Sequence, residues 1–199
     1  MKNENLWKEY APTARGAKEH FEDLGLKLDD LRGKKILDIG SGLNQLANEL
    51  KPLGIDIISL DPFYGLSREE REAIYKSGYE DGPEKLKELL DQLESENSSS
   101  SLVAGRSEAL PFDDESFDLI ISHYGSPFYA EDGEKVEKFF SEQSRVLKSG
   151  GEARVYPTWF KEPTVEKSAA QEKAIVKLRE SFNIEKKNGA WILKKNQKP

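Results

Sequence analysis

The 199-residue sequence contains no cysteine, which excludes disulfide bonds and thiolate metal sites. It has no apolar run long enough to cross a membrane, and its first residues lack the apolar core of a signal peptide. It also lacks an excess of positive charge, because the formal net charge is −7. A protein that binds mainly by wrapping nucleic acid is therefore not expected. These absences predict a cytoplasmic protein with no metal site and no membrane association.

The length suits one domain spanning residues 1–199, large enough to bury a substantial core. Its central feature is the stretch 34–50, which opens with the short apolar run Ile36 to Ile39, interrupted only by Asp38. This run predicts a buried strand of a parallel sheet. The turn Gly40-Ser41-Gly42 follows, and apolar residues at helical spacing come next. A strand, a glycine turn and a helix start together let a ligand approach bare backbone.

Two classes of ligand use such a turn. A dinucleotide site requires a third glycine, but Gln45 stands at that position. Asp38 would also place a negative charge beside a pyrophosphate, and an acid there suits a cationic ligand better.

The segment Leu37-Asp38-Ile39-Gly40-Ser41-Gly42 resembles the first motif of class I S-adenosylmethionine-dependent methyltransferases. The resemblance implies that the turn packs against the amino-acid part of S-adenosylmethionine, with Asp38 near its ammonium group. Asn44 stands where the family often has glycine. Because asparagine tolerates left-handed backbone angles, we expect the loop to be preserved. The alternative is an ordinary turn in a doubly wound sheet.

A second predicted strand, 55–60, ends at Asp61-Pro62. An acid at this end of the strand lies in the crevice where open α/β sheets bind ligands, and its two oxygens can accept hydrogen bonds from both ribose hydroxyls. The resemblance assigns Asp61 that role, with Pro62 beside it. Folds that bind NAD share this signal, and an aspartate that merely begins a loop before proline is the alternative.

A third strand, 102–105, leads into a segment of the form G-x-x-E-x-L-P-F-x-x-x-S-F-D at 105–118. This segment resembles the small-molecule branch of the same methyltransferase family, in which the loop lies along the adenine ring. Arg106 occupies a position where that branch often has an acid, and a guanidinium cannot accept hydrogen bonds. Ser107 and Glu108 are then expected to contact adenine, or backbone and apolar packing hold the ring.

The fourth predicted strand ends at Ser122, and His123 and Tyr124 follow it. In the family, this end of the strand faces the methyl group and the acceptor. Ser122 is therefore a candidate cofactor contact. His123 is a candidate base that deprotonates the acceptor, or else a residue that shapes the pocket. Tyr124 is a candidate for orienting the acceptor.

Two further segments decorate this core. Residues 1–33 are expected to form an N-terminal helical cap in which Tyr10 and Arg15 reach the cofactor carboxylate; simple packing and surface charge are the alternative roles. Residues 63–101 form an extended helical crossover with an apolar face that includes Leu86, Leu89, Leu90 and Leu93. It is either a substrate cap or a decorated connection.

Near the C-terminus, a helix over 133–147 is predicted to end at Gly150-Gly151, and a fifth strand over 152–156 follows. Asn188-Gly189 predicts a hairpin over 182–195. The resemblance, which covers roughly 34–195, implies an α/β, Rossmann-like fold. Its mostly parallel seven-stranded sheet has the order 3-2-1-4-5-7-6, an antiparallel C-terminal hairpin and helices on both faces.

The function predicted by this resemblance is methyl transfer from S-adenosylmethionine to an oxygen, nitrogen or carbon atom of an unidentified small-molecule acceptor, by a monomer or homodimer. Three alternatives remain open. One is a non-catalytic binding or partner protein with the methyltransferase fold, favoured slightly by Arg106 and Asn44. Another is an RNA or protein methyltransferase that uses the lysines of the C-terminal hairpin. The third is a nicotinamide-dependent oxidoreductase.

Overall fold

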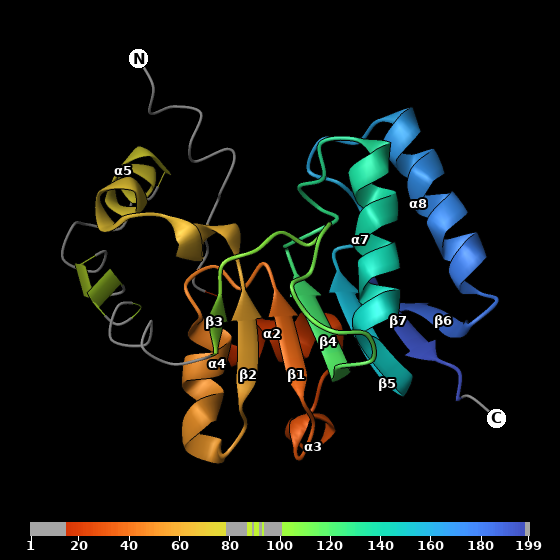
Figure 1. Ribbon diagram of the computed structural model, residues 1–199, viewed down its shortest axis with the longest axis horizontal. Helices are drawn as coiled ribbons and strands as arrows, with labels where there is room; N and C mark the ends of the chain where they lie inside the picture. Colours follow the sequence, from red (N-terminus) through yellow and green to blue (C-terminus); the bar gives the residue numbers. More distant parts are fainter. Residues whose placement is uncertain (1–14, 79–86, 89, 92, 94–100, 198–199) are drawn as a thin grey trace.

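The computed structural model describes residues 15–78, 87–88, 90–91, 93 and 101–197. Its centre is a seven-stranded sheet of order β3-β2-β1-β4-β5-β7-β6, shown in Figure 1. The strands are β1 (Ile36–Ile39), β2 (Ile57–Leu60), β3 (Leu102–Val103), β4 (Phe117–His123), β5 (Leu147–Tyr156), β6 (Phe182–Lys187) and β7 (Ala190–Lys195). Strands β1 to β5 pair in parallel, whereas β7 is antiparallel to both β5 and β6. The predicted fold class and strand order are confirmed.

Helices cover both faces of this sheet (Figure 1). They are α2 (Ala17–Leu24), α3 (Leu28–Leu31), α4 (Gln45–Leu50), α5 (Arg68–Gly78), α7 (Gly133–Val146) and α8 (Val165–Leu178), with the short 3₁₀ helices η1 (Lys51–Leu53) and η2 (Pro62–Gly65). Helices α7 and α8 pack on one face, and α2 and α4 pack on the other. Within the described ranges, no helix is long and apolar enough to span a lipid bilayer.

Alternation along β4 decides which side chains meet which helices. Beyond the irregularity between Phe117 and Leu119, Ile120 belongs to the core beneath α7 and α8, whereas Leu119 and Ile121 belong to the core beneath α2 and α4. Since successive side chains point to opposite faces, His123 continues the row of Leu119 and Ile121 toward α2. The strand ends at His123, and the alternation ends with it. Tyr124 follows with a φ of 54°, which turns the chain out of the strand.

A third apolar cluster lies beside β3, within the crossover 63–101. It joins Phe63 and Tyr64 of η2 to Ile74 of α5 and to Leu90 and Leu93. Leu90 and Leu93 of the predicted apolar face are both buried in this cluster, while Leu86 and Leu89 lie outside the described residues.

The region after α7 differs from the prediction. Helix α7 ends at Val146, and Gly150-Gly151 lie inside β5 rather than at the end of the helix. The pairing of β4 with β5 shifts register between Phe117 and Leu119, and the residues before Glu152 bulge out of the ladder. The expected hairpin is present, with Asn188 and Gly189 both at positive φ between β6 and β7.

Candidate active site

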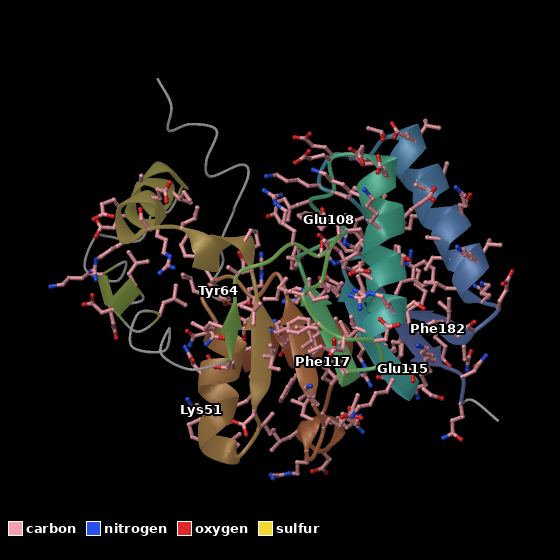
Figure 2. The ribbon with its side chains drawn as sticks, viewed as in Figure 1. Lys51, Tyr64, Glu108, Glu115, Phe117 and Phe182 are labelled. Atoms are coloured by element: carbon pink, nitrogen blue, oxygen red, sulfur yellow. The ribbon has the colours of Figure 1, made fainter. Side chains whose placement is uncertain are left out.

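A hollow lies at the carboxyl ends of β1, β2 and β4. It holds about 760 Å³, counted together with the open space at its mouth. In Figure 2, the labelled Tyr64 and Glu108 lie at this end of the sheet, and Lys51 and Phe117 lie toward the other end. The loops that follow β1, β2, β3 and β4 supply most of the wall of the hollow. The wall consists of Ile39, Gly40, Gly42, Leu60, Asp61, Pro62, Gly105, Arg106, Ser107, Glu108, Tyr124, Gly125, Ser126, Tyr129, Glu131 and Lys135.

The glycine turn after β1 touches the loop after β4 through bare backbone. A Cβ atom on Gly40, whose φ is 76°, would lie 2.7 Å from the Cα of Gly125. A Cβ atom on Gly125 would lie 2.6 Å from the carbonyl oxygen of Ile39. Side chains at either position would push the two loops apart, so this wall of the hollow depends on both glycines. Gly125 was missed in the sequence, because its partner is more than eighty residues away.

Asp61 links the end of β2 to the same turn. Its Oδ2 accepts a 2.9 Å hydrogen bond from the backbone N–H of Gly42, and its Oδ1 accepts one of 2.9 Å from Phe63. Burial raises the pKa of Asp61 to about 6, although both hydrogen bonds oppose the shift. Each carboxylate oxygen has a second lone pair, so Asp61 can still accept hydrogen bonds from two ligand hydroxyls.

Asp38 is buried within β1, and it is not part of the wall. Burial and, secondly, the charge of Asp61 raise its pKa to about 7. Two neighbouring buried carboxylates favour a cation beside them, since a positive charge would stabilise the ionised form of both.

Ser41 and Ser122 hold the loops rather than line the hollow. Ser41 Oγ lies 2.8 Å from the hydroxyl oxygen of Tyr64. Ser122 Oγ lies 2.7 Å from the carbonyl oxygen of Ser126 and 3.2 Å from that of Ile39, within donating distance of both.

The loop after β3 brings Ser107 and Glu108 to the wall. Ser107 Oγ donates a 2.6 Å hydrogen bond to Ser126 Oγ, which joins this loop to the one after β4. Two residues of α7 fix the next part of the loop. Arg145 donates to the carbonyl oxygens of Leu110 and Phe112, and Glu142 accepts from the backbone N–H of Leu110. Neither α7 residue has a local sequence signal, because both act across more than thirty residues.

His123 and Tyr124 have different surroundings, although they are adjacent. Tyr124 lines the hollow, and the guanidinium of Arg15 lies 4.0 Å from its ring centroid. The fully buried side chain of His123 faces α2, where its Nε2 lies 2.8 Å from Oδ2 of Asp23 and its ring lies 4.3 Å from that of His20. Burial lowers the pKa of His123 to about 4, although a carboxylate partner by itself favours the charged form. His123 is not part of the wall of the hollow.

Of the predicted cofactor residues, the structure brings Gly40, Gly42, Asp61, Pro62, Ser107 and Glu108 together around one hollow. Arg15 is not part of the wall but lies over the ring of Tyr124, which is, whereas Tyr10 lies outside the described residues. Sequence reasoning missed five wall residues that follow β4, namely Gly125, Ser126, Tyr129, Glu131 and Lys135, the last two of which form a 2.6 Å ion pair.

These groups fit the chemistry of S-adenosylmethionine. Asp61 offers acceptors for ribose hydroxyls, the Asp38–Asp61 pair favours a positive charge, and the glycine turn leaves room for close approach. Arg106 also lies in the wall and offers only donors, so Ser107 and Glu108 are the nearby side-chain acceptors for an adenine amino group.

Comparison with known proteins gives the same answer. The family model described as "Methyltransferase domain" matches residues 37–155. The uncharacterized methyltransferase YcgJ of Bacillus subtilis is 29% identical over 153 residues, which make up 75% of this chain and 50% of YcgJ. The chain thus spans about half the length of this curated relative.

Solved structures share the fold, and two of them illustrate the likeness. The PH0226 protein of Pyrococcus horikoshii aligns with a TM-score of 0.56 at 18% identity, over 91% of each chain. A protein of Methanosarcina mazei described as a SAM-dependent methyltransferase aligns with a TM-score of 0.50 at 16% identity, over 83% of this chain and 93% of its own.

The chain belongs to the methyltransferase domain family, and its sheet order is that of class I S-adenosylmethionine-dependent methyltransferases.

Proposed function

We propose that this protein binds S-adenosylmethionine in the hollow at the carboxyl ends of β1, β2 and β4 and transfers its methyl group to a small-molecule acceptor. The observation that carries the proposal is the position of Asp61. Its carboxylate lies in the wall and is bonded to the backbone of Gly42, so a hydroxyl acceptor and a bare glycine turn form one unit.

Each predicted cofactor residue has a role in this proposal. Asp61 accepts hydrogen bonds from the ribose, with Pro62 beside it, and Ser107 and Glu108 face the adenine. Gly40 and Gly42 give the amino-acid part close access to backbone.

The polar groups behind the wall support the same arrangement. Ser41 and Ser122 keep the two loops in place through the hydrogen bonds described above. Asp38 stabilises the positive charge of the ligand. Arg15, together with Tyr10, is proposed to face the carboxylate of the cofactor.

When bound, S-adenosylmethionine supplies a methyl group that is already activated for transfer to a nucleophile. The protein must therefore chiefly orient the acceptor and exclude water. Tyr124 is placed to do the first, because it lines the hollow and its ring is held by Arg15. The predicted role of His123 as a base has weaker support, since its ring faces α2. We propose instead that His123, held by Asp23, positions the neighbouring Tyr124.

A small acceptor is supported by the acidic net charge of −7 and by the contacts of the hairpin lysines. Lys195 Nζ donates to the carbonyl oxygens of Ser144 and Leu147, and Lys194 lies 3.4 Å from the carboxylate of Glu152. Because these two ammonium groups have partners within the protein, they are less available to bind RNA phosphates. We propose a cytoplasmic monomer or homodimer, consistent with a sequence that lacks cysteine.

One observation favours a second candidate, a non-catalytic protein with the methyltransferase fold. Arg106 lies in the wall where an adenine-facing acid is usual in the family that the sequence resembles, and it cannot accept the adenine amino hydrogens.

A methyl-transfer assay distinguishes the two functions. The purified protein is incubated with methyl-labelled S-adenosylmethionine and a panel of small phenols, amines and carboxylic acids, and labelled product is counted. The proposal expects label in at least one acceptor, and loss of this label in an Asp61→Ala variant. Cofactor binding without label transfer to any acceptor, including RNA and protein fractions, would favour the non-catalytic function.

A further inference from the structure

A continuous group of aromatic side chains extends from the hollow to the surface at the carboxyl ends of β4 and β5. We call Tyr124, Phe128, Tyr129, Tyr156 and Trp159 the aromatic patch. Neighbouring rings meet edge to face, with centroids 5.3 Å apart for Tyr124 and Phe128, 5.2 Å for Tyr124 and Tyr156, and 5.6 Å for Tyr156 and Trp159. Tyr124 and Tyr129 line the hollow, so the patch begins where the cofactor is proposed to bind.

The outer end of the patch is exposed yet held in place. Trp159 is 49% exposed, although it is a large aromatic residue. A Cβ atom on Gly189 would lie 3.1 Å from the rings of both Trp159 and Tyr156, so these rings rest directly on the hairpin turn. Backbone hydrogen bonds of Thr158 to Gly189 and of Lys161 to Phe128 fix both sides of the loop that carries Trp159. An exposed, prearranged aromatic face beside a hollow is typical of a site for a flat apolar ligand.

Two positive charges lie over the rings that line the hollow. The Arg15 guanidinium lies 4.0 Å from the Tyr124 ring centroid, and the Lys161 ammonium lies 5.1 Å from that of Tyr129. Of the acids nearby, Glu131 pairs with Lys135, Glu19 accepts from the backbone N–H of Gly16, and Asp23 contacts His123, whose buried ring faces α2. Because the two cations lie over the rings that line the hollow, an anionic substituent is favoured over a cationic one at that end of the patch.

We infer that the methyl acceptor carries a flat aromatic ring with an anionic substituent, and that this ring binds on Tyr156 and Trp159 with its reactive end toward Tyr124. The inference rests on the proposed function and names the substrate class for that same site. The aromatic faces select for a ring, and Lys161 and Arg15 select for negative charge.

Three probes separate ring from charge. 2-Naphthoate has both a flat ring and an anion, decahydro-2-naphthoate keeps the anion but not the flat ring, and 2-naphthylmethylammonium keeps the ring but has the opposite charge. Each is titrated into the full-length protein in the presence of S-adenosylhomocysteine. The readout is the indole N–H resonance of ¹⁵N-labelled tryptophan, with Trp7, Trp159 and Trp191 assigned by single substitutions to phenylalanine.

The expected result is that 2-naphthoate shifts the Trp159 resonance, while the other two probes bind at least about tenfold more weakly. Trp159→Ala removes this reporter, so its 2-naphthoate binding is measured by calorimetry beside the wild type, and it is expected to be weaker by about tenfold or more. Lys161→Ala is expected to weaken 2-naphthoate without weakening the cationic probe. The matched control is Leu53→Ala, because Leu53 is 48% exposed but lies on η1, away from the hollow.

Calorimetric titration of the same samples with S-adenosylhomocysteine distinguishes failure of the aromatic-acceptor inference from failure of the proposed methyltransferase function. Cofactor-product binding with an unmoved Trp159 resonance overturns the aromatic acceptor alone. A lack of cofactor-product binding overturns the proposed function, and with it the assignment of the ring as acceptor. A dimer that dissociates on Trp159→Ala would show that a second copy covers the patch, and would also overturn the inference.

Discussion

The Asp61 carboxylate accepts a 2.9 Å hydrogen bond from the backbone N–H of Gly42, which joins the end of β2 to the turn after β1. The two groups come from separate strands, and each is a familiar feature of ligand sites at the carboxyl edge of a parallel sheet. Their direct contact makes the turn and the carboxylate one structural unit. A change at Asp61 therefore affects both the hydroxyl acceptor and the position of the turn.

Replacing Asp61 by alanine is expected to weaken S-adenosylmethionine binding by about 1.5–3 kcal/mol, the scale of hydrogen bonds to a charged group. Calorimetric titration measures this loss. The matched control is Asp56→Ala, because Asp56 is exposed and precedes β2 at the opposite end of the strand. Equal affinity in the Asp61 variant and the wild type would remove the ribose assignment.

The contact between the glycine turn and the loop after β4 predicts the effect of Gly125→Ala. The added Cβ atom would lie 2.6 Å from the carbonyl oxygen of Ile39 and 2.9 Å from Ser122 Oγ. We expect the free energy of unfolding to fall by about 1–3 kcal/mol, as in other overpacked sites, and cofactor affinity to fall with it. Denaturant unfolding tests this, with Gly65→Ala as the control, since its Cβ atom would meet only Ala104, at 3.4 Å. Wild-type stability and affinity in Gly125→Ala would contradict the described contact.

Cofactor affinity is expected to rise with pH. The pKa of Asp38 is about 7 and that of Asp61 is about 6, so both carboxyls bind protons at pH 5.5. A cationic ligand favours the ionised forms, and its binding must release those protons. The affinity should therefore increase from pH 5.5 to pH 7 by up to about tenfold per pH unit for each proton released. Titrations across this range measure the slope, and Asp38→Asn should flatten it. A wild-type affinity that is constant over this pH range would show that ligand binding does not change the protonation of Asp38.

The buried pair His20 and His123 predicts that the free energy of unfolding depends on pH. Burial lowers the pKa of both His20 and His123 to about 4, from an ordinary value of 6.5. Between pH 4 and 6.5 the unfolded chain binds more protons at these histidines, so their contribution to stability falls as the pH falls.

The contribution of His123 is isolated by comparison with His123→Phe, because the pKa shifts of Asp38 and Asp61 are common to both proteins. The wild type minus variant difference in unfolding free energy should rise by up to about 1.4 kcal/mol per pH unit from pH 4 to pH 6.5. Urea unfolding at several pH values gives the difference directly. A difference that does not change with pH would mean that His123 is charged when folded.

Local patterns in the sequence predicted most of the helices and strands, whereas the strand order was predicted from the resemblance to the methyltransferase family. The Ile36–Ile39 run, the Asn188-Gly189 turn and the helical spacing of apolar residues each identify an element without reference to distant residues. Asn44 adopts a φ of 62° and is fixed by a 2.6 Å hydrogen bond from Ser59, as its tolerance of left-handed angles predicted. The predicted start of β5 was wrong, because a bulge against β4 depends on pairing that Gly150-Gly151 alone do not indicate.

The site was predicted less completely. Residues that directly follow strand ends, such as Asp61 and Ser107, could be placed because all parallel strands end at one edge of the sheet. His123 could not be placed, since its orientation depends on where the strand stops alternating. The sequence also gives no local signal for Arg145, which fixes the loop after β3 from a helix more than thirty residues away.

The most direct test of the account is calorimetric titration of the protein with S-adenosylmethionine and S-adenosylhomocysteine, with NADH as the control. The account predicts that the first two bind with micromolar Kd and that NADH does not bind. Binding of neither methionine derivative would contradict the central claim, and would make Arg106 in the wall of the hollow the first residue to substitute.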